Sequence, residues 1–181
     1  MIAKTLAKLI DEAILPGLVL VLGKFLGVIL VAKIISANFR ITLGEFFFPS
    51  FSFSNYPTYY TVNSYSNLVM FAAVAIGAAF ILVRAHFFHA SHITPTMHVR
   101  LLKLGLQGLI AETYQLYHQA AVWLIFLWLA TILVLSQAFF EISAPIIAIV
   151  AVLVTLNFSW FLIADIELEV EIFREQKKIL R

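Results

Sequence analysis

An apolar stretch from Pro16 to Ala37 constrains the fold more than any other part of the sequence. At about 1.5 Å per residue it makes a helix of about 33 Å, enough to cross a hydrocarbon core of about 30 Å. Pro16 suits the first turn of a helix, because the N–H that proline lacks has no partner there. The stretch therefore predicts a transmembrane helix over residues 16–37.

Three further apolar stretches, residues 65–83, 120–140 and 142–164, have the same character. The chain has 181 residues and only 12% of them are charged, which is about half the share in a soluble domain. Its mean hydropathy is +0.99. These features predict an all-α, multi-pass membrane protein that forms a single domain (residues 1–181) with four transmembrane helices.

Amphipathic or polar segments flank these spans. Residues 1–13 place their apolar side chains on one helical face, which predicts an amphipathic helix at the membrane interface that precedes a turn at Pro16. Residues 84–118 are polar, and Thr94-Pro95 predicts the start of a helix that continues into the third span. Residues 165–181 predict a helical tail, which local ion pairs stabilise.

Aromatic side chains are dense in residues 38–64, where prolines, serines and asparagines interrupt any helical pattern. Aromatic rings gather at the boundary between membrane and water, so we expect an external loop that lies against lipid headgroups. Within it, the alternation of phenylalanine and serine over 51–54 favours a short strand or one arm of a hairpin.

Basic residues indicate the orientation of the chain. Lys and Arg concentrate in the N-terminal segment, in 84–118 and in the tail, whereas Arg40 is the basic residue of the aromatic loop. The positive-inside rule then places both termini and the connection 84–118 in the cytoplasm. We expect a multi-pass protein of the inner (cytoplasmic) membrane.

Lys24 is the residue of the predicted spans whose position in the membrane costs the most free energy. A lysine near the centre of a span costs about 2.5 to 3.5 kcal/mol on insertion scales, so it usually has a partner or reaches water. Counted from its own end of the span, Asn157 of the fourth span has the same depth, which predicts a hydrogen bond between the two side chains or a shared water. Each residue also has its own alternative: Lys24 only extends toward the membrane surface, or Asn157 bonds its own backbone or a neighbouring protomer.

Small residues indicate where helices pack closely. Gly17 and Gly27 lie on the helical face of Lys24, and Gly23 with Gly27 forms a small-xxx-small pair. Gly77 lies among alanines in the second span and has the same role. These glycines predict contacts between neighbouring helices.

Histidines supply the one candidate for a metal or haem site. His86, His89 and His92 share an arc if that segment is helical, and His118 lies in the same connection. A transition metal on these side chains, or a haem between His86 and His118, is one hypothesis. The alternative is that these imidazoles bind only water and headgroups, because no His-Glu-x-x-His pattern accompanies them.

Other chemistry has little support in the sequence. The chain has no cysteine, hence no thiolate ligand or catalytic thiol, and no nucleophile elbow or glycine-rich phosphate loop. Glu112, Asp165 and Glu167 are potential acids or bases at a solvated boundary. A net charge of +2 gives no reason to expect a nucleic acid partner.

Three functions remain open. The first is a non-catalytic membrane subunit or scaffold, whose partners are the bilayer and other membrane chains or copies of itself, with no cofactor. The second is an oligomeric channel or small transporter that uses Lys24 and Asn157. The third is a metal- or haem-binding membrane enzyme that uses His86, His89 and His118.

Overall fold

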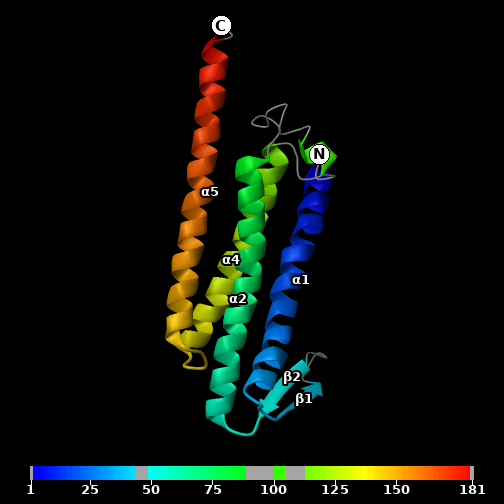
Figure 1. Cartoon of the computed structure of the whole chain (residues 1–181), viewed down its shortest axis with the longest axis vertical. Helices are drawn as coiled ribbons and strands as arrows, with labels where there is room; N and C mark the ends of the chain where they lie inside the picture. Colours follow the sequence, from blue (N-terminus) through cyan, green and yellow to red (C-terminus); the bar gives the residue numbers. More distant parts are fainter. Residues whose placement is uncertain (1, 44–48, 89–99, 105–112, 180–181) are drawn as a thin grey trace.

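The structure is a computed structural model that describes residues 2–43, 49–88, 100–104 and 113–179. Its architecture is four long helices that run alternately up and down (Figure 1): α1 (Ile2–Ile34), α2 (Tyr56–Phe87), α4 (Thr113–Phe139) and α5 (Pro145–Ile179). Each is long and apolar enough to cross a membrane. The prediction of an all-α, multi-pass membrane protein is confirmed at this level.

The two ends of the bundle differ in what they carry (Figure 1). A small antiparallel sheet, β1 (Phe39–Leu43) and β2 (Pro49–Phe53), lies at one end, which we call the hairpin end. Both chain termini lie toward the other end, which we call the terminal end.

Helix α1 packs chiefly against α2, and α5 packs chiefly against α4. The core between them is made of small and apolar side chains such as Val74, Ala78, Leu127 and Ala130. Because α2 and α4 pack against each other in the middle, α1 and α5 occupy opposite sides of the bundle (Figure 1).

The four predicted packing glycines all lie at helix contacts. A Cβ on Gly27 would come within 3.0 Å of the carbonyl oxygen of Ser66, and one on Gly23 within 3.2 Å of the Cα of Met70. These two glycines therefore let α1 approach the backbone of α2.

The other two glycines accommodate aromatic rings of α4. A Cβ on Gly17 would lie 3.3 Å from the ring of Phe126, and one on Gly77 would lie 2.0 Å from the ring of Trp123. The Trp123 ring thus occupies the space that a side chain at position 77 would need.

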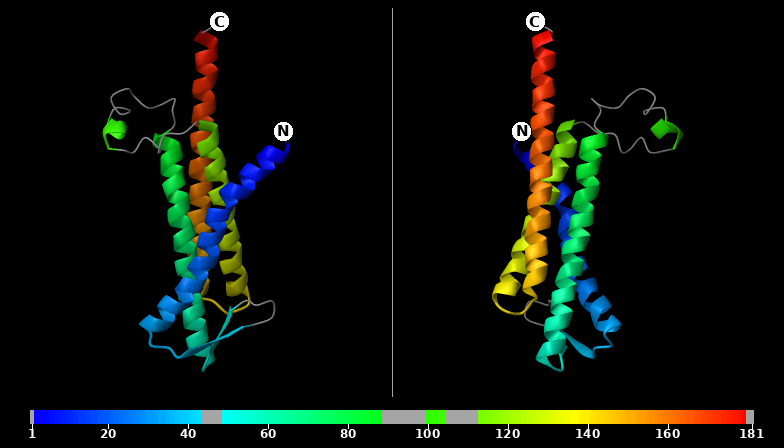
Figure 2. Two further views of the ribbon diagram at one scale, coloured as in Figure 1. Left: turned by 90° about the vertical axis from the view of Figure 1, so that its right-hand side faces the viewer. Right: turned by 60° about the vertical axis from the view of Figure 1, so that its left-hand side comes forward.

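Helix α1 differs from its prediction at Pro16. The predicted interfacial helix 1–13 and its turn at Pro16 are absent as separate elements, because α1 continues through the proline from Ile2 to Ile34. Proline is tolerated inside membrane helices at the cost of one backbone hydrogen bond and often a bend. In the left view of Figure 2 the first turns of α1 lean away from the bundle. Among the described side chains, the candidate span runs from Ile10 to Ile34.

Helix α2 begins nine residues before the predicted start of the second span. Asn55 caps it, since the side-chain oxygen of Asn55 accepts a hydrogen bond from the backbone N–H of Thr58 at 2.9 Å. Pro57 occupies the first turn, where proline is favourable. The polar stretch 62–67, which was expected at the membrane boundary, therefore lies inside the helix.

The hairpin pairs Phe39 with Phe53 and Ile41 with Phe51 in antiparallel register. The predicted strand over 51–54 corresponds to β2. The rings of Phe39, Phe51 and Phe53 pack on a small apolar cluster of α1 and α2. The hairpin is thereby fixed to the helix ends instead of forming a separate loop.

Two helices end with a residue in the left-handed region. Ser36 follows α1 with φ of 53°, and Glu141 follows α4 with φ of 59°. In both cases a backbone N–H then bonds five residues back, from Ala37 to Ala32 and from Ile142 to Gln137. This is the Schellman arrangement, which satisfies the last carbonyls of a helix.

The terminal-end segments are described in part. Helix α5 runs without a break to Ile179, so the predicted tail 165–181 is helical over nearly all its length. In the connection 84–118, residues 84–87 belong to α2, 100–103 are helical and α4 begins at Thr113. The predicted helix from Thr94-Pro95 lies largely outside the described residues.

Candidate functional site

Among the described residues, two groups of polar side chains each join three or more parts of the bundle, one group toward each end. The first, which we call the lysine cluster, joins α1, α2, α4 and the α4–α5 turn. Its members are Lys24, Asn63, Ser66, Asn67, Gln137 and Ser143.

Lys24 lies at the centre of this cluster. Its Nζ atom is 2.8 Å from Asn63 Oδ1, 2.8 Å from Ser66 Oγ and 2.5 Å from Asn67 Oδ1. Asn67 and Ser66 are 0% exposed, and Asn63 is 8% exposed. The three acceptors lie at positions i, i+3 and i+4 of α2, which is the spacing of one helical face.

The orientation of the amides follows from one backbone carbonyl. Asn63 Nδ2 lies 2.7 Å from the carbonyl oxygen of Ile142, which accepts only, so Asn63 must direct its nitrogen there and its oxygen toward Lys24. The same nitrogen lies 2.8 Å from Gln137, whose facing atom is therefore an oxygen. Asn67 in turn directs its nitrogen to that oxygen at 2.9 Å and its own oxygen to Lys24.

Ser66 completes the set of acceptors. Its hydroxyl donates to the carbonyl oxygen of Asn63 at 2.9 Å and therefore presents a lone pair to Lys24. All three near neighbours of Nζ are thus acceptors, which an ammonium with three N–H groups matches. The bonds that the described residues give Lys24 go to neutral oxygens, so dipoles and not a carboxylate stabilise its charge.

Side chains from the same part of α2 also form hydrogen bonds with the α4–α5 turn. The backbone N–H of Ala144 donates to Ser64 Oγ at 2.8 Å, and the Tyr56 hydroxyl donates to the carbonyl oxygen of Glu141 at 2.7 Å. Asn67 Nδ2 also donates to Ser143 Oγ at 3.0 Å. The polar residues of α2 therefore connect Lys24 on one side to the turn on the other.

The predicted bond between Lys24 and Asn157 does not form. Asn157 is exposed on α5 and donates from Nδ2 to the carbonyl oxygen of Leu153 at 2.7 Å, which is the alternative given above for Asn157. The depth comparison used a span that began at Pro16, whereas α1 continues through Pro16 without a break. It also ignored that α1 and α5 lie on opposite sides of the bundle (Figure 1).

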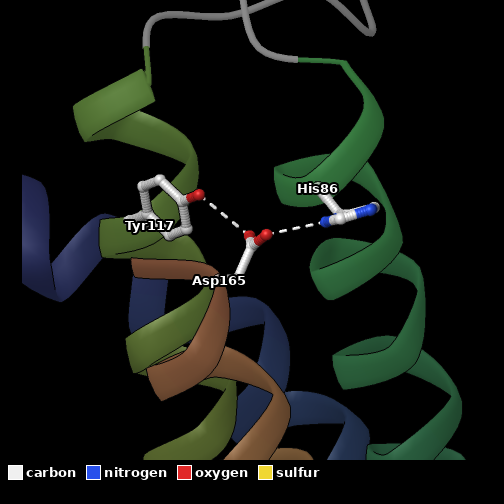
Figure 3. A network of polar contacts seen from close by, with 3 residues as sticks. All are labelled: His86, Tyr117 and Asp165. Carbon is white, nitrogen blue, oxygen red and sulfur yellow. Dashed lines mark hydrogen bonds and ion pairs between the residues drawn. The ribbon is translucent and has the colours of Figure 1, made fainter. Parts of the chain in front are cut away.

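The second group, which we call the histidine cluster, lies toward the terminal end (Figure 3). It consists of His86 from α2, Tyr117 from α4 and Asp165 from α5. His86 Nδ1 is 2.6 Å from Asp165 Oδ1, and the Tyr117 hydroxyl donates to Asp165 Oδ2 at 2.8 Å. One carboxylate therefore joins three helices.

Burial is uneven within the histidine cluster. The side chain of Asp165 is 8% exposed and that of His86 is 36% exposed. With Asp165 ionised, Nδ1 of His86 is the donor, which leaves the lone pair on Nε2. The ring of His86 also lies edge-on to Phe87 with centroids 4.5 Å apart. A fixed imidazole of this kind can accept a proton or bind a metal ion.

The remaining histidines do not join this group within the described residues. His118 Nε2 lies 3.2 Å from Glu12 Oε2, so it contacts a carboxylate of α1 and not the one of α5. His89, His92 and His98 lie outside the described residues. Among the residues that the structure describes, no group of three histidine or acidic side chains is placed to hold a metal ion.

The sequence contained a signal for the lysine cluster but little for the histidine cluster. Asn63, Ser66 and Asn67 show a helical spacing that marks one polar face, provided that the helix is known to begin at Tyr56. Asp165 was considered only as a solvated carboxylate. Its contacts with His86 and Tyr117 depend on how three helices are packed, and no local pattern encodes that.

Comparison with protein-family models, curated proteins and solved structures found no match to this chain. Function is therefore inferred from the geometry alone.

Proposed function

We propose that this protein is a non-catalytic membrane subunit or scaffold that assembles, through α5, with other membrane chains or with copies of itself. The observation that carries the proposal is the length of α5. Its C-terminal part extends beyond the ends of α1, α2 and α4 in every view (Figures 1 and 2). An isolated helix of a few turns is marginal in water, so packing against a partner is the usual source of its stability.

The surface of α5 adds to this support. Trp160 is 75% exposed, and Ile166 and Leu168 are exposed near the end of the candidate span. Asn157 lies on the exposed surface of α5 and bonds its own backbone. An amide at this depth usually finds a partner on a neighbouring helix, because lipid offers it none.

The lysine cluster supports a structural role over a transport role. The three N–H groups of Lys24 are matched by three acceptors, so the ammonium has no free donor for a passing anion. Asn157, the second residue of the transport hypothesis, faces away from it. We therefore propose that Lys24 stabilises the packing of helices within one chain and takes no part in transport.

The proposal also covers the membrane in which the protein lies and its orientation there. The terminal end collects most of the Lys and Arg residues, and the positive-inside rule then favours a cytoplasmic terminal end in the inner membrane. Reporter fusions after Arg181 test this orientation, since a reporter that is active only outside the cytoplasm would contradict it.

The assembly proposal is tested by native mass spectrometry of the full chain, extracted in mild detergent. We expect a mass above that of one chain, and its value separates copies of this chain from foreign partners. Trp160→Ala should lower the assembled fraction by about tenfold, because exposed aromatic residues are frequent anchors at interfaces. Phe80→Ala on α2 is the matched control, since Phe80 is 57% exposed and lies on another helix.

Two outcomes would contradict the proposal. One is a single chain in both the detergent extract and crosslinked membranes. The other is an equal loss of assembly in the Trp160 and Phe80 variants, which would indicate general hydrophobic contact and not a surface on α5.

A further inference from the structure

The hairpin has one apolar and one polar face. Strand pairing places Phe39 opposite Phe53 and Arg40 opposite Ser52, and successive side chains of a strand point to opposite faces. The phenylalanines pack toward α1 and α2. Asn38 and Ser54 extend the row of Arg40 and Ser52 by one position beyond the paired residues. The hairpin therefore presents a polar row away from the helices.

This polar row borders a hollow of about 490 Å³. Its lining residues come from both strands and the residues next to them: Asn38, Phe39, Arg40, Ser52, Phe53 and Ser54. The described lining thus contains a guanidinium, two hydroxyls and an amide, and these described residues include no carboxylate. Ser52 Oγ reaches the carbonyl oxygen of Arg40 only at 3.5 Å, which is long for a hydrogen bond, so this hydroxyl can turn to a ligand.

The charged residue in the described lining of this hollow is Arg40, whose side chain is exposed. Arginine presents a planar fork of N–H donors, which matches the geometry of phosphate oxygens in a bidentate contact. Serine hydroxyls and the asparagine amide add neutral donors. A donor-rich hollow with one guanidinium is suited to an oxyanion with several acceptor oxygens.

The position of the hollow identifies the source of such an anion. The hairpin lies where α1 ends and α2 begins, which is the boundary of the candidate spans at Ile34 and Tyr56. Headgroups occupy this depth on either side of the hydrocarbon core. Tyr56 and Tyr59 beside the hairpin belong to the aromatic residues that lie at headgroup level.

From these observations we infer that the hollow at the base of the hairpin binds a phosphate group, in the form of a phospholipid headgroup, with Arg40 as its charged contact. Ser52, Ser54 and Asn38 supply the neutral hydrogen bonds. The inference is independent of assembly through α5, because none of these residues lies on that helix.

The test uses the full chain, purified in mild detergent and mixed with phosphatidylglycerol or with diacylglycerol of the same acyl chains. Native mass spectrometry counts the lipids that remain bound. We expect one retained phosphatidylglycerol and no retained diacylglycerol. Arg40→Gln should reduce retention by about tenfold, as expected for the loss of a charge-assisted bond to phosphate. Circular dichroism verifies that the variant keeps its helices.

Lys33→Gln is the matched control, because Lys33 is an exposed cation at the same end of the bundle but does not line the hollow. It should change retention by less than about twofold, since an exposed charge contributes little. A separate titration with inorganic phosphate distinguishes the two sources. Lipid that stays bound in millimolar phosphate identifies a headgroup site, and displaced lipid identifies a site for free phosphate.

Two results would overturn the inference. If Arg40→Gln and Lys33→Gln reduce retention equally, the lipid responds to general surface charge and not to the hollow. If the wild-type chain retains diacylglycerol as well as phosphatidylglycerol and binds no inorganic phosphate, the phosphate group is not recognised.

Discussion

The lysine cluster and the histidine cluster both connect three or more parts of the bundle, but they do so by different chemistry. In the lysine cluster a cation is surrounded by neutral oxygens, and amides extend the network to the α4–α5 turn. In the histidine cluster an anion accepts from an imidazole and a phenol, and the imidazole is partly exposed.

This difference bears on what each cluster can do. Hydrogen-bond partners are costly to remove from the buried lysine cluster, because every group that is left behind loses its bond without gaining water. The histidine cluster lies near the boundary with water, where solvent replaces part of what is lost. We therefore expect the first cluster to determine stability and the second to remain accessible to protons and reagents.

The substitution Lys24→Met is expected to have the largest effect and tests this comparison most directly. The substitution leaves Asn63, Ser66 and Asn67 each short of one donor, and we expect a loss of about 3 kcal/mol in the free energy of unfolding. Unfolding by sodium dodecyl sulfate in mixed micelles measures it. Lys33→Met, at an exposed position of the same helix, is the control and should change stability by less than about 0.5 kcal/mol. Equal effects would mean that the lysine cluster is not structural.

A smaller effect is expected from Asp165→Asn. The amide keeps the size of the carboxylate but offers one oxygen in place of two, so either His86 or Tyr117 loses its acceptor. We expect a loss of about 1 to 2 kcal/mol in the same unfolding assay. Glu167→Gln, at an exposed position of α5, should have almost no effect. A loss as large as that of Lys24→Met would remove the distinction between the clusters.

Tyr117→Phe tests the phenol alone. The ring stays in place and the bond to Asp165 Oδ2 is lost, so we expect about 1 kcal/mol of destabilisation. In the double variant with Asp165→Asn the two effects should be less than additive, because they remove the same contact. Strict additivity would show that the two groups do not interact.

Asn157→Leu should have the smallest effect on the fold of a single chain. Among the described residues, its amide nitrogen bonds its own backbone, so the unfolding free energy of the isolated chain should change by less than about 0.5 kcal/mol. The same variant should lower the assembled fraction in native mass spectrometry if α5 forms the interface. A large loss of stability in the single chain would place Asn157 in the interior and contradict its exposed position.

The sequence was sufficient for the number and approximate position of the spans, because a run of about twenty apolar residues has few alternatives to a membrane helix. The predictions made from the sequence were wrong at the helix ends. Asn55 and Pro57 form a helix start, yet a proline in an aromatic loop was interpreted as an interruption. Pro16 was given the opposite role, as a first-turn residue, whereas α1 passes through it.

Partners of the polar residues were harder to predict. Lys24 was expected to have a partner, and it has three, but the choice of Asn157 depended on depth along the membrane without knowledge of which helices are neighbours. The contact of His86 with Asp165 spans 79 positions in the sequence. Such pairs follow from which helices pack against one another, and no local pattern in the sequence indicates that.

The dependence of the amide orientation on the Ile142 carbonyl has a consequence for biogenesis. A ribosome delivers α1 and α2 to the bilayer first, when the nitrogens of Asn63 and Asn67 still lack the acceptors that the α4–α5 turn provides. The hydrogen bonds of the α1–α2 pair are therefore completed only when α4 and α5 are inserted. Truncation before residue 142 leaves amide nitrogens of α2 without their acceptors, and quality-control proteases can recognise such an unpaired polar surface.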